Sequence, residues 1–256
     1  MVAIIEWAIF ERCLIFFKFC MTIMINEIFK KKYVILPVIH TLSKKQALEN
    51  INIAHNHGAD GVFLINHTIS WVELLKIYEE VKLEFNNYWI GLNCLGLPPK
   101  LVFRKIHPET SGVWVDNAAI DEETKYQEKA ASIKEVINKT NFRGIYFGGV
   151  AFKYQKGVKN LSLATQTAKK YMDVVTTSGN ATGEAPTIDK IIEMKSVLED
   201  FPLAVASGIT PENISNYLPY VDFFLVAKGI SKSFYELDPD KLDRLIDSVN
   251  SFQSLY

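Results

Sequence analysis

Eight short apolar runs recur along the chain, and their spacing is the feature that most limits the possible fold. Most are continuous stretches of apolar residues without polar alternation, a pattern typical of strands buried on both faces of a parallel sheet. The runs start 19 to 31 residues apart, which leaves room for a crossover helix in nearly every gap. The expected strands are VILPVIH (34–40), GVFLINH (61–67), WIGLNCL (89–95), GVWVDNA (112–118), RGIYFGG (143–149), MDVVTTSG (172–179), PLAVASG (202–208) and VDFFLVAKG (221–229).

Helical patterns occupy most of the gaps between these runs. Ser70 and Thr187 are suited to cap helix N-termini, and Gly58 suits a helix C-terminus. Eight strands alternating with helices over about 220 residues predict one domain, a (β/α)8 TIM barrel over 28–256. An open doubly wound sheet is the alternative, but no G-x-G-x-x-G follows the first run. The expected helices are 44–58, 70–85, 123–139, 162–171, 187–200, 211–218 and 238–252.

Composition excludes several functional classes. The chain has 256 residues, 48% hydrophobic and 22% charged, which is ordinary for a globular protein. A formal net charge of −1 and the lack of a long basic run argue against nucleic acid as a partner. Three cysteines without metal or disulfide spacing indicate reduced thiols and a cytoplasmic location. We expect no metal, because no His, Asp and Glu cluster has ligand spacing, and no cofactor.

The first 27 residues, MVAIIEWAIFERCLIFFKFCMTIMINE, form an apolar N-terminal extension interrupted by Glu6, Glu11, Arg12 and Lys18. A transmembrane helix needs about 20 nearly charge-free residues, and no signal-peptide cleavage site is visible. The segment is an amphipathic helix docked on the barrel or on a second copy of the chain, a membrane-surface anchor, or sequence before a true start at Met21 or Met24. We favour the first and third interpretations over a membrane role. A homo-oligomer formed through this segment is a weaker hypothesis.

Active sites of TIM barrels lie at the C-terminal ends of the strands, so the residues that end each run are the candidates. Asp116 is a candidate general acid or base, a partner for a sugar hydroxyl, or a structural link to a neighbouring loop. His40 is suited to proton transfer near neutral pH, and Lys153 to charge stabilisation or, if desolvated, to Schiff-base formation. A structural histidine and a surface lysine are the alternatives. The candidate substrate-binding residues are Asn66, Asn93, Thr177, Ser178 and Asn180.

Glycines follow the last two runs. The segments SGITPEN (207–213) and AKGISKS (227–233) place glycine where backbone N–H groups can approach an anion closely. Many TIM barrels hold a phosphate in the loops after strands seven and eight. The alternative is that the glycines only form tight turns. The candidate phosphate-binding residues are Ser207, Gly208, Lys228 and Gly229.

From about residue 28 to the C-terminus, the sequence resembles the BtpA/SgcQ family of TIM-barrel proteins. The stretches that carry the resemblance are IFKKKYVILPVIH, GADGVFLINH, IGLNCL, FKY, VVTTSGNATGEAP and VASGITPENI. The most specific is SGNATGEAP, which is similar to the family signature (T/S)G-x-ATG-x-P. The resemblance implies a fold like that of phosphate-binding barrels such as phosphoribosylanthranilate isomerase. The family is named for a role in photosystem I stability, and it has no established reaction.

The chain departs from that family at four places. Thr41-Leu42-Ser43-Lys44 stands in place of a Pro-Leu-Pro-Gly loop, Ile65 in place of Glu, Gly149 in place of Asp and Tyr154 in place of His. We expect an enzyme that binds a small phosphorylated metabolite, a sugar phosphate or nucleotide-like compound, and performs isomerase or lyase chemistry. Because two acids are missing, a non-catalytic ligand-binding or assembly factor of the BtpA type is the alternative.

Overall fold

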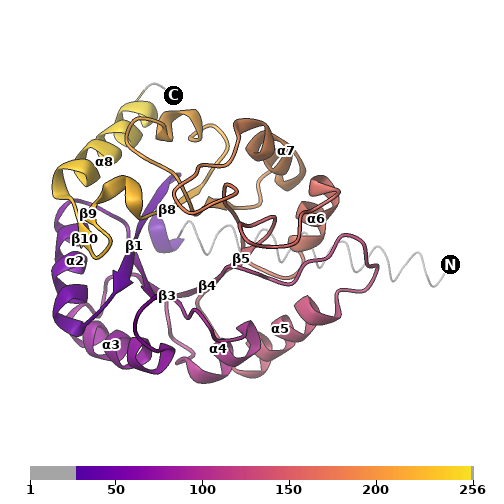
Figure 1. Cartoon of the computed structure of the whole chain (residues 1–256), viewed down its shortest axis with the longest axis horizontal. Coiled ribbons are helices and arrows are strands. Elements are labelled where there is room, and N and C mark those ends of the chain that lie inside the picture. Colours follow the sequence, from indigo (N-terminus) through magenta and orange to yellow (C-terminus); the bar gives the residue numbers. More distant parts are fainter. Residues whose placement is uncertain (1–26, 255–256) are drawn as a thin grey trace.

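The computed structural model describes residues 27–254, which form a closed barrel of eight parallel strands in chain order. Figure 1 shows the strands at the centre of the molecule. The predicted (β/α)8 TIM barrel is therefore confirmed. Each strand lies in one of the eight apolar runs, and β1 extends one residue further than expected. The expected apolar extension over 1–27 lies, except for its last residue, outside the described residues. The strands are β1 (Val34–Thr41), β2 (Val62–Asn66), β3 (Ile90–Asn93), β4 (Gly112–Val115), β5 (Ile145–Gly149), β6 (Val174–Thr177), β7 (Leu203–Val205) and β8 (Phe223–Val226).

A ring of helices surrounds the barrel (Figure 1). Ser70 and Thr187 accept hydrogen bonds from first-turn N–H groups, and Gly58 at φ 81° follows the end of the first barrel helix, so these three predictions are confirmed. None of the described helices is long and apolar enough to cross a membrane. The helices are α2 (Lys44–Asn56), α3 (Trp71–Glu84), α4 (Pro99–Lys105), α5 (Glu128–Lys139), α6 (Leu161–Ala168), α7 (Ile188–Leu198) and α8 (Pro239–Gln253).

Two crossovers differ from the prediction. Helix α4, between β3 and β4, was not among the expected helices. The prediction of a helix over 211–218 is wrong, because only a 3-10 turn, η1 (Ile214–Asn216), forms there. The Asn213 side chain accepts a hydrogen bond from Thr210 N at 2.9 Å and donates to Gly208 O at 2.9 Å. Such local bonds compete with helix formation, and Pro219 disfavours its continuation.

The barrel interior is filled by aromatic rings. Phe147 packs edge-on against Phe63 at 5.2 Å and against Phe223 at 5.3 Å between ring centroids. Trp89 packs on Phe63 at 5.1 Å, and Phe29 covers Trp89 and Phe223 at 5.6 Å each. Because these side chains close the interior, the barrel is a packed core and not a pore. A ligand site therefore has to lie at an end of the barrel.

Three aspartates repeat one structural role at the N-terminal ends of the strands. Each lies one or two residues before an even-numbered strand, and its carboxylate accepts a hydrogen bond from a backbone N–H of the preceding strand. These bonds satisfy strand-end donors and link neighbouring strands. The pairs are Asp60 with Ile35 at 2.8 Å, Asp173 with Tyr146 at 2.8 Å and Asp222 with Leu203 at 2.9 Å.

A short hairpin that the sequence did not predict follows β8 and the 3-10 turn η2 (Lys228–Ile230). Its strands are β9 (Ser231–Ser233) and β10 (Glu236–Leu237), and Figure 1 shows it beside α2. The α2 side chains of Asn50 and Gln46 both donate to the carbonyl of Tyr235, at 3.0 and 2.7 Å. Asn50 also accepts from the N–H of Leu237 at 2.7 Å. The hairpin is thus tied to the barrel wall.

Candidate active site

The alternation of side chains along each strand decides which strand-end residues face the barrel axis. Val38, Ile65 and Trp114 belong to the apolar interior of the barrel. Successive residues of a strand point to opposite sides, so the residues two positions later lie on the axial side. These residues are His40, His67 and Asp116. His40 and Asp116 were predicted site residues, whereas the substrate-binding residue predicted on the second strand was Asn66.

Burial and neighbouring charges shift the pKa values of three residues at the C-terminal end of the barrel. Burial, and then the charges of His67 and Lys153, lower the pKa of His40 from 6.5 to about 4. Burial also lowers the pKa of His67, which the charge of Asp116 opposes. Burial raises the pKa of Asp116, while Asn93, Lys153 and His67 counteract this. The structure therefore brings together all three predicted catalytic residues, His40, Asp116 and Lys153, and adds His67.

Hydrogen bonds hold Asp116 in place. The buried Asn93 donates from Nδ2 to Asp116 Oδ1 at 3.0 Å, and Gln155 donates to the Asp116 backbone carbonyl. In the described part of the chain, the other carboxylate oxygen, Oδ2, has no hydrogen-bond donor. An oriented carboxyl group with a raised pKa and one free oxygen is suited to exchange a proton with a ligand. Asn93 acts here through Asp116.

Lys153 is positioned by the loop that follows β5. Phe152 is buried and packs 6.0 Å from Trp114, which closes the top of the barrel interior. The ammonium of Lys153 lies 5.6 Å from the centroid of the Phe152 ring. Its backbone N–H donates to Ser178 Oγ at 2.8 Å. Ser178, predicted to bind substrate, thus joins the loop after β5 to the loop after β6.

Lys190, in the first turn of α7, was missed by the sequence reasoning. Its ammonium donates to Ala151 O at 2.6 Å and to Ser178 O at 2.8 Å, which braces the same two loops. Burial lowers the pKa of Lys190 to about 8. A helix residue gives no strand-end signal, so only the capping pattern at Thr187 indicated that this position is near the barrel end.

Three further predicted substrate-binding residues are not members of the axial group. Both polar atoms of the Asn66 side-chain amide are hydrogen-bonded to backbone groups of loops. Its Oδ1 accepts from Leu95 N at 2.8 Å, and its Nδ2 donates to Leu95 O and Ile69 O at 3.2 Å. Thr177 donates to Ala151 O at 3.3 Å. Asn180 is exposed in the loop after β6. Their contact with a substrate stays a prediction.

The predicted phosphate-binding residues lie where the loops after β6, β7 and β8 converge. Ser207 Oγ accepts from Gly183 N at 3.1 Å and donates to Ala181 O at 3.2 Å. A Cβ atom added at Gly183 would lie 3.0 Å from Cδ of Lys228, so the lysine side chain crosses this loop. Ser207 and Lys228 therefore border the same small-residue loop.

Close packing requires glycine at positions 208 and 229, and the backbone N–H groups at these positions are also suited to bind an anion. A Cβ atom at Gly208, which has φ 68°, would lie 2.0 Å from Ala185 N, and one at Gly229 would lie 2.0 Å from Ile209 O. The tight-turn interpretation therefore has a structural basis. Yet within residues 27–254 the N–H groups of both glycines lack a protein acceptor. Two free backbone N–H donors near Lys228 can bind an anion.

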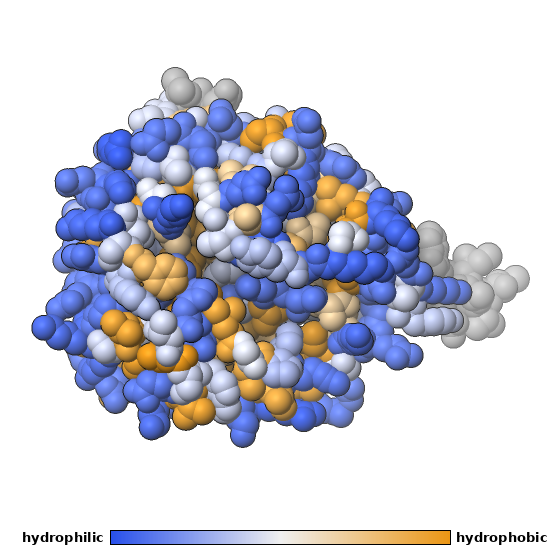
Figure 2. Space-filling view, viewed as in Figure 1, coloured by the Kyte–Doolittle hydropathy of each residue, from blue (hydrophilic) through white to orange (hydrophobic). Residues whose placement is uncertain are grey.

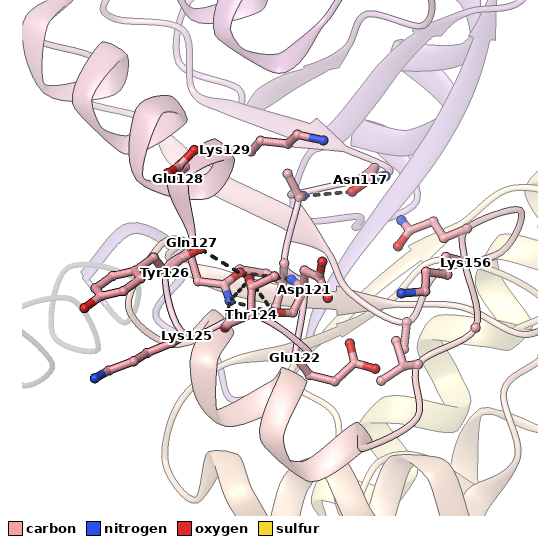
Figure 3. A pocket seen from close by; sticks show the side chains of 16 residues that line it. Asn117, Asp121, Glu122, Thr124, Lys125, Tyr126, Gln127, Glu128, Lys129 and Lys156 are labelled. Carbon is pink, nitrogen blue, oxygen red and sulfur yellow. Dashed lines mark hydrogen bonds between the residues drawn. The ribbon is translucent and has the colours of Figure 1, made fainter.

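A separate hollow of about 620 Å³ lies between the loops after β4 and β5. Figure 3 shows Asp121, Glu122 and Lys156 on its sides, with Tyr126 turned outward. None of the four axial residues lines it. In Figure 2 the surface seen in this view is mostly hydrophilic, with hydrophobic side chains exposed near its centre. The hollow is therefore a feature of the rim and not of the axial group.

Two other kinds of site have little support in the described residues. Within 27–254, no group of three His, Cys, Asp or Glu side chains is arranged to hold a metal ion. Cys94 is buried, and its burial raises the pKa of the thiol to about 12, so it is a poor nucleophile at neutral pH.

Comparison with solved structures agrees with the fold. Phosphoribosyl anthranilate isomerase from Thermus thermophilus has a TM-score of 0.58 and 15% identity, covering 85% of this chain and 98% of that one. Tryptophan synthase subunit alpha from Legionella pneumophila has a TM-score of 0.64 and 12% identity, covering 91% and 98%. A geranylgeranylglyceryl phosphate synthase from Thermoplasma acidophilum, in complex with sn-glycerol-1-phosphate, has a TM-score of 0.62 and 12% identity, covering 88% and 96%.

These similarities define the class of protein as a TIM barrel. The predicted likeness to phosphoribosylanthranilate isomerase is confirmed at the level of the fold. No family model and no curated protein matches the sequence. The BtpA/SgcQ assignment therefore stays a prediction from the resemblance.

Proposed function

We propose that this protein is an enzyme that binds a small phosphorylated metabolite and moves a proton on it, as isomerases and lyases do. The observation that carries the proposal is the axial group of His40, His67, Asp116 and Lys153, in which burial and neighbouring charges shift the pKa values of the two histidines and Asp116. It lies at the barrel end where TIM-barrel enzymes hold their substrates. The free N–H donors of Gly208 and Gly229 follow strands that end on the same side.

The arrangement suits proton transfer next to a carbonyl group. Neutral His40 or ionised Asp116 would accept a proton from carbon, and the electrons of the broken C–H bond would form an enolate. The ammonium of Lys153 would stabilise the negative charge on its oxygen. Return of the proton to the neighbouring atom completes an isomerisation, and loss of a leaving group at the β-carbon completes an elimination. Neither step consumes an oxidant or a reductant.

The phosphate part of the proposal rests on two kinds of support. The three loops after β6, β7 and β8 pack so closely that they leave no room for side chains at Gly208 or Gly229. Solved proteins of this fold include an isomerase of a phosphoribosyl compound and a synthase crystallised with a glycerol phosphate. A phosphate held by these loops would place the remainder of a small substrate toward the axial group.

A thermal-shift screen with inorganic phosphate, sugar phosphates, nucleotides and their unphosphorylated counterparts tests the proposal. A ligand at about 100 times its Kd adds roughly 2.7 kcal/mol of stability, which for a chain of this size means a rise in Tm of roughly 5–10 °C. Lys228→Ala should reduce the rise, whereas Lys105→Ala, an exposed residue on α4, should not. No rise with any phosphorylated compound would contradict the proposal.

Ligand binding without turnover is the second candidate function. Gly149 cannot carry the acid that the resembled family has on this strand, because a Cβ atom there would lie 1.9 Å from Asp116 O. Ile65 is buried in the apolar interior. If Asp116→Asn and Lys153→Ala both left turnover of an identified substrate unchanged, the catalytic assignment would be wrong. Binding without any turnover by the unaltered protein would favour the second candidate.

A further inference from the structure

Three rings meet at the C-terminal ends of β1 and β2. The ring of Phe234 stacks on that of His40 at 4.0 Å between centroids and 17° between planes. His67 lies 4.7 Å from His40 and 5.3 Å from Phe234. The ring cluster of His40, His67 and Phe234 therefore joins two members of the axial group to an aromatic side chain that the sequence reasoning did not single out.

Phe234 is held in position although half of it is exposed. It lies at the tip of the β9–β10 hairpin, where its side chain is 50% exposed. The hairpin is fixed to α2 through Asn50 and Gln46, and Tyr235 beside it donates to Thr68 Oγ1 at 3.3 Å. An exposed phenyl ring on an anchored hairpin loses little conformational entropy when a ligand covers it.

His40 has an unmet hydrogen-bonding group within this cluster. Its Nδ1 is buried and lacks a hydrogen-bond partner in the described part of the chain. Buried polar atoms without a partner are uncommon and mark places where a ligand or an ordered water completes the structure. The cluster thus combines the flat apolar ring of Phe234 with the neighbouring His40 Nδ1, which lacks a hydrogen-bond partner among the described residues.

We propose that Phe234 is a stacking surface for the substrate, and that the substrate is a phosphate ester that carries a flat, unsaturated ring. This inference rests on the proposed function and narrows its substrate class. Aromatic rings stack well on other π systems and less specifically on saturated sugars. Because Phe234 lies five positions after Gly229, the chain between them spans at most about 18 Å, so one small molecule can contact both.

Calorimetric titration with defined probes tests the inference. The ring-bearing probes are adenosine 5′-monophosphate, uridine 5′-monophosphate and phenyl phosphate; ribose 5-phosphate and inorganic phosphate lack the ring, and adenosine lacks the phosphate. We expect at least one ring-bearing phosphate to bind about tenfold or more tightly than ribose 5-phosphate. Phe234→Leu should remove that preference and leave ribose 5-phosphate binding unchanged, whereas Phe234→Tyr should keep it.

Tyr126→Leu is the matched control, because Tyr126 is an exposed aromatic residue on a different loop. Its binding preferences should equal those of the unaltered protein. Equal affinity for ring-bearing and ring-free phosphates, or a preference that survives Phe234→Leu, would overturn the inference while leaving the proposed function intact. Failure of every phosphorylated probe to bind would contradict the proposed function, and the inference with it.

Discussion

His40 is expected to titrate near pH 4, well below the ordinary pKa of 6.5 for histidine. The largest cause is burial, followed by the charges of His67 and Lys153. Phe234 covers one face of the His40 ring, and Nδ1 has no protein partner in the described residues. Protonation would therefore create a cation that has lost hydration and gained no acceptor. His40 should be neutral, and able to accept a proton, throughout the physiological pH range.

The lowered pKa of His40 also makes the free energy of unfolding depend on pH. Between pH 6.5 and about 4 the unfolded chain binds a proton at this residue and the folded chain does not, so the free energy of unfolding falls as the pH falls through this window. A change in pKa of about 2.5 corresponds to about 3.4 kcal/mol. The ring is partly open to solvent, which screens the effect, so we expect about 1–2 kcal/mol from His40.

Two measurements check this prediction. An NMR titration of the five histidines, assigned with His40→Gln, should show one resonance that titrates near pH 4. Urea unfolding at pH 7 and pH 4.5 should show a smaller loss of stability in His40→Gln than in the unaltered protein. His107→Gln, at an exposed loop position, is the control and should not reduce the loss. A His40 resonance that titrates near pH 6.5 would refute the reasoning.

Three other substitutions probe the framework of the site. Phe147→Ala should lower the free energy of unfolding by about 3–5 kcal/mol, since it empties the centre of the barrel; a loss below about 1 kcal/mol in urea unfolding would contradict the packing described. Lys190→Met removes the donor that two loop carbonyls share and leaves Ser178 O unpaired, while Ala151 O keeps the hydrogen bond from Thr177, so hydrogen exchange at the Lys153 amide should accelerate, and an unchanged rate would count against the brace. Asp222→Ala should cost about 1–3 kcal/mol and the exposed Asp200→Ala nearly nothing, so equal midpoints would argue against the strand-end role.

The barrel was predictable because its strands obey one strong physical requirement. A parallel strand in a closed barrel is covered by side chains on one face and by helices on the other, so it reads as a continuous apolar run. The seven-residue α4 was missed because it is too short for a helical repeat to be visible. The segment 211–218 was wrongly expected to be helical because its Asn213 prefers local bonds to the backbone.

The candidate site was predictable only where strand position and side-chain direction agree. His40 is the last residue but one of β1, Asp116 directly follows β4, and both lie on the axial side, so inspecting the ends of the runs identified them. Asn66 also ends a strand but bonds to neighbouring loops, and the next residue, His67, takes the axial position. Applying the alternation of the strand to its last two residues would have found His67.

Phe234 and Lys190 had no such signal, because their roles depend on contacts between segments distant in the sequence. Phe234 stacks on His40, although nearly the whole sequence of the barrel domain lies between these two residues. Lys190 acts on carbonyls that belong to two other loops. The contact of Phe234 follows from the closure of the barrel, which brings β8 beside β1, and the contacts of Lys190 follow from the pairing of β5 with β6. A single sequence records the residues but not which loop ends become neighbours.

The two ends of the barrel differ in how their polar side chains are satisfied. At the N-terminal end, aspartates satisfy strand donors, and Phe29 closes the aromatic interior. At the C-terminal end, burial shifts the pKa values of His40 and Asp116 in directions that oppose their charged forms. Holding uncompensated polar groups there costs folding energy, which the packed interior offsets. Removing interior contacts should therefore unfold the protein at acidic pH first, where the cost at His40 is greatest.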